Sequence, residues 1–293
     1  MARPLRIEFP GAFYHVTSRG DNRCTIFNGN KDREKFLSIY SEVSARLQWI
    51  TYAWCLMGNH FHLVVETPEP NLSEGMQVLN GTYTQHFNRA HGRTGHLFQG
   101  RFHSILVDQN VYFLEVIRYV LLNPVRAGLV TSAQDWPWSS FRAMVGLETP
   151  PDWLGLNFTL DAISECNGTR EQKQAFFAAF VESGMQDSRN PMENLNQQIY
   201  LGDDLFVAQA QEKILSDASL SGIVREQKRP PLEFLEDFDR TYPDRKEAMA
   251  RAYLSGQFCQ AEIARFYGVH TSSVSKAVRS FRQNGIHTVK FKL

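Results

Sequence analysis

The sequence predicts an α+β fold in its first half, followed by an all-α connector and a helix-turn-helix. Three observations predict this organisation. Strand and helix signals alternate over residues 1–147, amphipathic and acidic segments fill residues 148–229, and residues 230–293 contain the spacing of a helix-turn-helix near a basic C-terminal end. The 293 residues are enough for one large domain or two ordinary ones, and a hydrophobic content of 43% is enough for a buried core.

The predicted elements of the first domain follow one another in a simple order. Runs of β-forming residues predict strands over 12–19, 49–57, 60–67 and 101–107. Apolar residues at helical spacing predict helices over 32–47, 71–88 and 111–122. Gly58-Asn59 is a tight turn, Asn71 or Ser73 can cap the second helix, and Asn123-Pro124 stops the third. The first six elements form the split βαβ pattern of a ferredoxin-like sheet.

Cysteine usage and hydropathy exclude several classes of protein. The four cysteines are scattered without Cys-x-x-Cys spacing, so neither a disulfide framework nor a cysteine zinc site is expected. The first residues lack the apolar stretch of a signal peptide, and nowhere do about 18 apolar residues run together. We therefore expect a cytoplasmic protein that does not span a membrane.

The charges are distributed unevenly along the chain. The formal net charge is zero, yet residues 1–150 carry a net charge of +2, residues 151–220 carry −7 and residues 221–293 carry +5. The positive charge is concentrated at the C-terminal end, because residues 245–293 taken alone carry +7. The acidic middle part shows no pattern of site residues, and we expect a helical connector there. Because it masks a basic C-terminal end, the neutral total does not argue against a nucleic-acid partner.

Two histidines, His60 and His62, flank one apolar residue on the second strand of the predicted hairpin. Side chains alternate between the faces of a strand, so both imidazoles point the same way. Together they can bind one divalent metal ion through neutral nitrogens. An isolated pair of this kind is more often a polar decoration of a solvated sheet face, so a third ligand is needed to favour a metal site.

The helix over 111–122 supplies further candidates. Residues three or four apart line up on one side of it: Tyr112, Glu115, Tyr119 and Asn123. The apolar residues of the other side should pack on the sheet: Leu114, Ile117 and Leu121. A phenol has a pKa near 10, so its attack on phosphorus needs a metal ion that polarises the phosphate. The alternative for Tyr119 is a structural tyrosine at the margin between helix and sheet.

Three sequence blocks occur in this order: GNHFHLVV at 58–65, GHLFQGRF at 95–102 and RYVLLNPVRAGLV at 118–130. Together with the opening RPLRIEFPGAFYHVTSRGDNR, they resemble the HUH single-tyrosine transposases, and more closely the REP-associated tyrosine transposases of bacteria. The resemblance covers about residues 1–145, roughly half of the chain. It implies an HUH nuclease domain over residues 1–147.

The resemblance also implies roles for individual residues. His60 and His62 would ligate Mg²⁺ or Mn²⁺, and Tyr119 would attack single-stranded DNA, leaving a 5′-phosphotyrosyl link and a free 3′-hydroxyl. Asn123 would be the third metal ligand, although some relatives have glutamine there and asparagine is one methylene shorter. Tyr112 remains the alternative nucleophile. The resemblance further implies a nucleoid-associated bacterial protein, and it leaves open whether the protein is a monomer or a homodimer.

Other residues of the first domain are weaker candidates for DNA contacts. Arg101 begins a predicted strand near His96 and His103, and its planar guanidinium suits a phosphate. A surface arginine without a specific role explains it equally well. Trp136 and Trp138 have the aromatic faces for base stacking, but core packing is the favoured interpretation.

Residues 260–279 have the spacing of a helix-turn-helix. Ala264 is small where two helices would cross, Gly268 makes the turn, Val274 anchors the second helix, and Thr271 or Ser272 can cap it. The side chains expected to point outward from that helix are Ser273, Ser275, Lys276 and Arg279. The residues expected to contact the DNA backbone are Arg279, Arg282, Lys290 and Lys292. The local charge favours DNA over the alternative, a small helical module that binds protein.

Two functions are compatible with these patterns. The first is a metal-dependent single-strand DNA endonuclease and transesterase that acts at or near DNA hairpins such as repetitive palindromic elements, with the helix-turn-helix on duplex DNA. The second is a non-catalytic regulator that binds hairpins. The presence of His60, His62 and Tyr119 favours the first, because a binding module needs none of the three.

Overall fold

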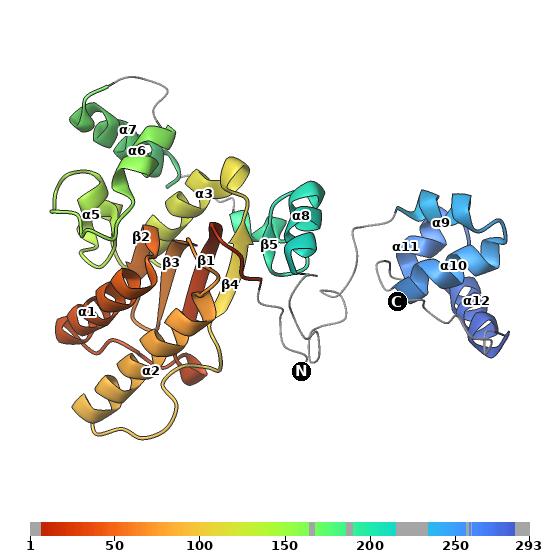
Figure 1. Cartoon of the computed structure of the whole chain (residues 1–293), viewed down its shortest axis with the longest axis horizontal. Helices are drawn as coiled ribbons and strands as arrows, with labels where there is room; N and C mark the ends of the chain where they lie inside the picture. Colours follow the sequence, from red (N-terminus) through yellow and green to blue (C-terminus); the bar gives the residue numbers. More distant parts are fainter. Residues whose placement is uncertain are drawn as a thin grey trace. The chain divides into compact units, whose positions relative to one another are not determined.

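The computed structural model describes residues 7–163, 168–185, 190–214, 234–255, 258 and 260–284 (Figure 1). The described residues fall into two compact units. One reaches from residue 7 to Asp203, and the other from Asp204 to residue 284.

A five-stranded sheet with the order β2-β3-β1-β4-β5 forms the centre of the first unit. Its strands are β1 (Ala12–Arg19), β2 (Ile50–Leu56), β3 (His60–Thr67), β4 (His103–Val107) and β5 (Tyr200–Leu201). Strand β1 pairs antiparallel with both β3 and β4, β3 pairs antiparallel with β2, and β5 runs parallel to β4. Because β3 lies between β1 and β2, the first four strands follow the predicted split βαβ order.

Helices cover both faces of this sheet (Figure 1). On one face, α1 (Asn30–Leu47) and α2 (Leu72–Ala90) pack against each other, and Phe36 of α1 lies 4.7 Å, ring to ring, from Phe61 of β3. On the other face, α3 (Gln109–Leu121) contacts β2 and β3, and its Phe113 lies 5.0 Å from Tyr52. Since His60 and His62 alternate with Phe61, both histidines belong to the face that α3 covers.

The remaining elements of the described chain are all helical. In the first unit they are η1 (Asp21–Arg23), α4 (Asn123–Arg126), η2 (Ala133–Asp135), α5 (Phe141–Met144), α6 (Leu156–Ile163), α7 (Arg170–Ser183) and η3 (Pro191–Asn194). In the second unit they are α8 (Asp204–Ile214), α9 (Leu235–Thr241), α10 (Arg245–Ser255), α11 (Gln260–Phe266) and α12 (Thr271–Asn284). None of the helices described here combines the length and the apolar character that crossing a bilayer requires.

The third helix differs from its prediction at both ends and on its buried side. It begins at Gln109, because the Asp108 carboxylate accepts a hydrogen bond from the backbone nitrogen of Asn110 at 3.0 Å and caps it. Pro124 does not end the helical backbone, since α4 begins at Asn123 and a proline fits the first turn of a helix. Phe113 rather than Leu114 is buried against the sheet, whereas Ile117 and Leu121 are buried as predicted.

The prediction of an all-α connector over 148–229 is wrong at Tyr200–Leu201. This segment adds strand β5 to the edge of the sheet, where Leu106 N donates to Ile199 O and Asp108 N donates to Leu201 O, each at 2.8 Å. Two residues are too few for a recognisable strand pattern. The connector up to Asp203 lies in the same compact unit as the predicted first domain.

The C-terminal helices α11 and α12 lie where the spacing predicts them. Gly268, in the turn that joins them, has a φ of +61°, a left-handed conformation that favours glycine. Ala264 and Val274 are both buried in the core of this unit, with exposed fractions of 4% and 0%. That these helices form a DNA-binding helix-turn-helix stays a prediction.

Two glycines of α2 should respond oppositely to alanine. A Cβ at Gly75 would lie 2.2 Å from Trp49 Cζ2, whereas a Cβ at Gly81 meets nothing within 4 Å. We expect Gly75→Ala to lower the free energy of unfolding by about 1–3 kcal/mol through overpacking. We expect Gly81→Ala to raise it by about 0.5–1 kcal/mol, because alanine loses less backbone entropy.

Denaturant unfolding followed by tryptophan fluorescence measures this effect in the first unit, because all five tryptophans of the chain lie between Trp49 and Trp153. Equal effects of the two substitutions would contradict the predicted contact between Gly75 and Trp49.

Candidate active site

A pocket with a volume of about 350 Å³ lies on the sheet face that α3 covers. Strands β1, β3 and β4, helix α3 and the segment before β4 all contribute to it. The side chains that line it are His15, Thr17, Ser18, Arg19, His60, His62, Gln99, Arg101, His103, Ile105, Tyr119 and Met192. Four of the residues singled out in the sequence therefore meet here: His60, His62, Tyr119 and Arg101.

Three histidines lie side by side on the floor of the pocket. The rings of His60 and His62 are 4.9 Å apart, and the ring of His15 stacks on that of His62 at 5.2 Å. A hydrogen bond of 2.9 Å joins His15 Nε2 to His62 Nδ1. The pairing of β1 with β3 places His15 in this position, and sequence reasoning missed it. The alternation of side chains along the predicted strand 12–19 could have indicated that His15 points to one face of the sheet.

Burial keeps these imidazoles neutral. Desolvation, followed by the charge of His103, lowers the pKa of His15 to about 3. Desolvation, followed by the charge of Arg19, lowers the pKa of His60 to about 4, and burial holds the pKa of His62 well below its usual range. A neutral imidazole is the form that ligates a metal ion.

Hydrogen bonds determine which nitrogen of His60 is available. The Asn59 amide nitrogen donates to Arg23 O at 3.1 Å, which directs Asn59 Oδ1 to His60 Nδ1 at 2.6 Å. Because an amide oxygen only accepts, His60 Nδ1 carries the hydrogen and Nε2 keeps its lone pair. His62 Nε2 is buried and has no hydrogen-bond partner among the described residues.

Tyr119 faces the histidines from α3. Its ring lies 5.9 Å from that of His15 and 6.1 Å from that of His62, in edge-on arrangements. Burial raises the pKa of the phenol, and the positive charges of Arg126 and Arg19 lower it in part. The guanidinium carbon of Arg126 lies 5.3 Å from the centre of the ring. Tyr112, the alternative nucleophile, is not among the residues that line the pocket.

Asn123 lies one turn beyond Tyr119, and its amide nitrogen donates to Tyr119 O at 2.8 Å. It is not among the residues that line the pocket. Within the described residues, no group of three or more histidine, cysteine, aspartate or glutamate side chains has the geometry of a metal site. The role of Asn123 as third ligand stays a prediction.

Several further lining residues were not singled out in the sequence: Thr17, Ser18, Arg19, Gln99, Ile105 and Met192. Arg19, the last residue of β1, is paired across the sheet with His60. Met192 comes from the connector, where no site residue was expected. Of the two histidines that lie near Arg101 in the sequence, His103 lines the pocket and His96 does not.

Trp136 and Trp138 lie outside the pocket and pack against the protein. The guanidinium carbon of Arg33 lies 5.9 Å from the ring of Trp136 and 5.5 Å from that of Trp138. The indole nitrogen of Trp136 donates to Leu56 O at 3.2 Å. These contacts agree with the packing role that the sequence favoured.

The predicted DNA contacts of the C-terminal helices are only partly described. On α12, Lys276 is exposed, and Ser273 and Ser275 are partly buried. The side chains of Arg279 and Arg282, and the residues Lys290 and Lys292, lie outside the described part of the chain.

Comparisons with known proteins relate the first domain of the chain to one group of transposases. The sequence model of the family described as "Transposase IS200 like" matches residues 9–122. A relative from Haemophilus influenzae, named as a REP-associated tyrosine transposase, is 29% identical over 133 residues, which are 41% of this chain and 76% of that protein. A relative of the same name from Escherichia coli K12 is 27% identical over 106 residues, so the match spans 35% of this chain and 61% of that protein.

A solved structure of a REP-associated tyrosine transposase bound to a REP hairpin aligns with a TM-score of 0.44 and 21% identity, over 52% of this chain and 89% of that one. The family match covers strands β1–β4 and helices α1–α3, and with them His60, His62 and Tyr119. Over residues 9–122, the first domain of this chain is therefore similar to the IS200-like transposases.

Proposed function

We propose that this protein is a metal-dependent single-strand DNA endonuclease and transesterase, with Tyr119 as its nucleophile. The observation that supports it best is the meeting of a phenol, three neutral imidazoles and two guanidinium groups in one pocket. Two relatives are named as REP-associated tyrosine transposases, which supports REP DNA as the substrate, and we propose a hairpin in it as the site of action.

The histidines suit a divalent metal ion. To bind a metal ion through Nε2, His62 must keep the lone pair on that nitrogen. It does so if its single hydrogen is on Nδ1 and is donated to His15 Nε2. The buried and unpartnered His62 Nε2 and the oriented His60 would then supply two ligands, and the Asn123 amide oxygen is the proposed third. Such a mixed set suits Mn²⁺, and also Mg²⁺ if water completes the coordination. When bound, the ion would polarise the scissile phosphate.

The residues of the chain itself perform the covalent step. The Tyr119 oxygen forms a bond to phosphorus while the bond from phosphorus to the 3′ oxygen breaks, which leaves a 5′-phosphotyrosine and a 3′-hydroxyl. The phenol loses a proton and the leaving oxygen gains one. Arg19 and Arg126 favour the phenolate, as their lowering effect on the pKa of Tyr119 indicates. Arg19 and Arg101 line the pocket and have the guanidinium geometry that binds a phosphate.

The C-terminal helices are the proposed duplex-binding part. The net charge of +7 over residues 245–293 suits the phosphate backbone. Exposed Lys276 lies on α12, the helix that a helix-turn-helix would place in the major groove.

The nucleophile is tested by two matched substitutions. With a labelled hairpin oligonucleotide and Mn²⁺, we expect Tyr119→Phe to abolish the covalent protein–DNA adduct, because phenylalanine lacks the attacking oxygen. We expect Tyr112→Phe, on the same helix but outside the pocket, to keep the adduct. Denaturing gel electrophoresis measures it. An adduct in Tyr119→Phe would refute the assignment, and hairpin binding without cleavage by the unmodified protein would favour the non-catalytic regulator.

Metal removal separates cleavage from binding. We expect chelation to abolish the adduct and added Mn²⁺ to restore it, since the two histidines alone offer no charge to polarise the phosphate. Affinity for the hairpin, measured by fluorescence anisotropy, should change by less than about twofold, because phosphate contacts dominate it. Cleavage that persists after complete chelation would contradict a metal-dependent mechanism.

Lys276 tests the duplex-binding part. We expect Lys276→Gln to weaken duplex binding and to reduce the slope of log affinity against log salt by about 1, because one phosphate contact is lost. Adduct formation at saturating oligonucleotide should not change. Lys246→Gln, an exposed lysine on α10, is the matched control. An unchanged salt slope in Lys276→Gln would argue against this contact.

A further inference from the structure

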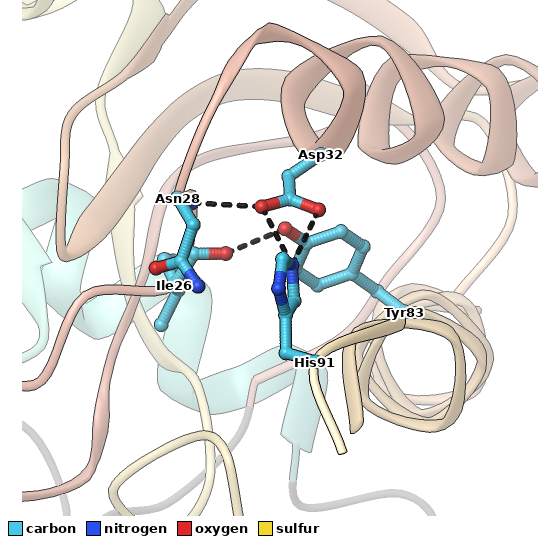
Figure 2. Close-up of polar contacts among 5 residues, drawn as sticks. All are labelled: Ile26, Asn28, Asp32, Tyr83 and His91. Atoms are coloured by element: carbon cyan, nitrogen blue, oxygen red, sulfur yellow. Dashed lines mark hydrogen bonds and ion pairs between the residues drawn. The ribbon is translucent and has the colours of Figure 1, made fainter. Parts of the chain in front are cut away.

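A polar pair, buried Asp32 with exposed His91, joins the two helices on the side of the sheet away from the pocket. Figure 2 shows the Asp32 carboxylate of α1, which is 4% exposed, facing His91 directly after α2. His91 Nε2 lies 2.9 and 3.0 Å from the two carboxylate oxygens. None of the reaction steps derived above uses this pair.

The same cluster holds one short loop segment from two sides (Figure 2). The backbone nitrogen of Asn28 donates to Asp32 Oδ2 at 2.8 Å, and the Tyr83 hydroxyl of α2 donates to Ile26 O at 2.5 Å. Both bonds end on backbone atoms, so they fix the path of residues 26–28 whatever the side chains there.

The segment 26–28 in turn holds the hairpin turn that precedes His60. Ile26 N and Phe27 N donate to Gly58 O at 3.0 and 3.2 Å. Earlier in the same loop, Gly20 N donates to Asn59 O at 2.8 Å. A Cβ at Gly20 would lie 2.1 Å from Cys24 O, so only glycine permits this close approach.

The turn at Gly58 and Asn59 contacts His60, a candidate metal ligand, directly. Asn59 Oδ1 accepts the hydrogen of His60 Nδ1 at 2.6 Å, while its amide nitrogen donates to Arg23 O in the same loop. A partner that binds the second nitrogen of a ligating histidine sets the orientation of the ring. The orientation of His60 therefore depends on the position of the turn, and through it on the segment 26–28.

We propose that Asp32, Tyr83 and His91 are positioning residues that hold His60 in its orientation toward the metal ion through the segment 26–28 and Asn59. This inference rests on the proposed function, because it concerns the metal site of that activity. None of the three residues lines the pocket. Their effect is on where His60 Nε2 points.

A purely structural role for the same cluster makes a different prediction. Leaving the buried Asp32 carboxylate without its partner destabilises the fold in either case. Only a positioning role also weakens metal binding and slows the chemical step in protein that is still folded. Metal affinity and the separate values of kcat and KM therefore distinguish the two roles.

The experiment compares four single variants and one double variant of the full chain. His91→Leu removes the partner of Asp32, and Tyr83→Phe removes only the hydroxyl that holds Ile26 O. His86→Leu is the matched control, a histidine on the same helix that forms no hydrogen bond within the described residues. Mn²⁺ affinity is measured by isothermal titration calorimetry without DNA, and oligonucleotide cleavage is measured in parallel below the unfolding temperature.

We expect His91→Leu and Tyr83→Phe each to weaken Mn²⁺ binding and to lower kcat by about tenfold, with KM for the oligonucleotide changed by less than about twofold. The double variant His91→Leu/Tyr83→Phe should lose less Mn²⁺ affinity and kcat than the product of the two single effects, because both residues act on the segment 26–28. His86→Leu should match the unmodified protein. His91→Gln, which keeps an N–H donor for Asp32, should recover part of the loss.

Unchanged Mn²⁺ affinity and kcat in folded His91→Leu and Tyr83→Phe would overturn the inference while leaving the proposed function intact. If His91→Leu does not fold, Tyr83→Phe decides, since its ring keeps its place among Phe27, Phe36 and Phe87. If the unmodified protein neither binds Mn²⁺ nor cleaves, the proposed function itself is wrong.

Discussion

The antiparallel register between β1 and β3 is the constraint on which the candidate active site depends. It pairs Arg19 with His60 and Thr17 with His62, and the same pleat places His15 on the face where both histidines lie. A slip of one residue would move every one of these side chains of β1 to the opposite face. Eight consecutive residue pairs join the two strands, so the register is strongly specified.

Helix α3 closes the pocket by burying one side against the sheet. Phe113, Val116 and Val120 take part in this burial, and the helical repeat then sets Tyr119 at its partly exposed margin. The position has an electrostatic cost, because burial raises the pKa of the phenol, and nearby arginines offset only part of it. A nucleophile in such a place needs further positive charge. A metal ion bound by the neutral imidazoles of His60 and His62 would supply it.

Much of the arrangement of the candidate active site could be predicted from the sequence, because it depends on short-range periodicity. The strand limits at 12–19 and 60–67, the shared face of His60 and His62, and the single turn between Tyr119 and Asn123 follow from periods of two and about 3.6 residues. Other parts depend on contacts between distant segments. Strand β5 has two residues and no pattern of its own, and Met192 reaches the pocket only because the connector packs on the first domain.

The sequence by itself determined the fold class of the first domain and the residue types that can perform phosphoryl chemistry, because strand and helix periodicity and local motifs are properties of neighbouring residues. Only the tertiary structure decided that His15 and Arg19 join the site, that Tyr112 does not, and that Asp32 and His91 meet. These outcomes depend on strand register and on the packing of helices far apart in the chain, which no local pattern encodes.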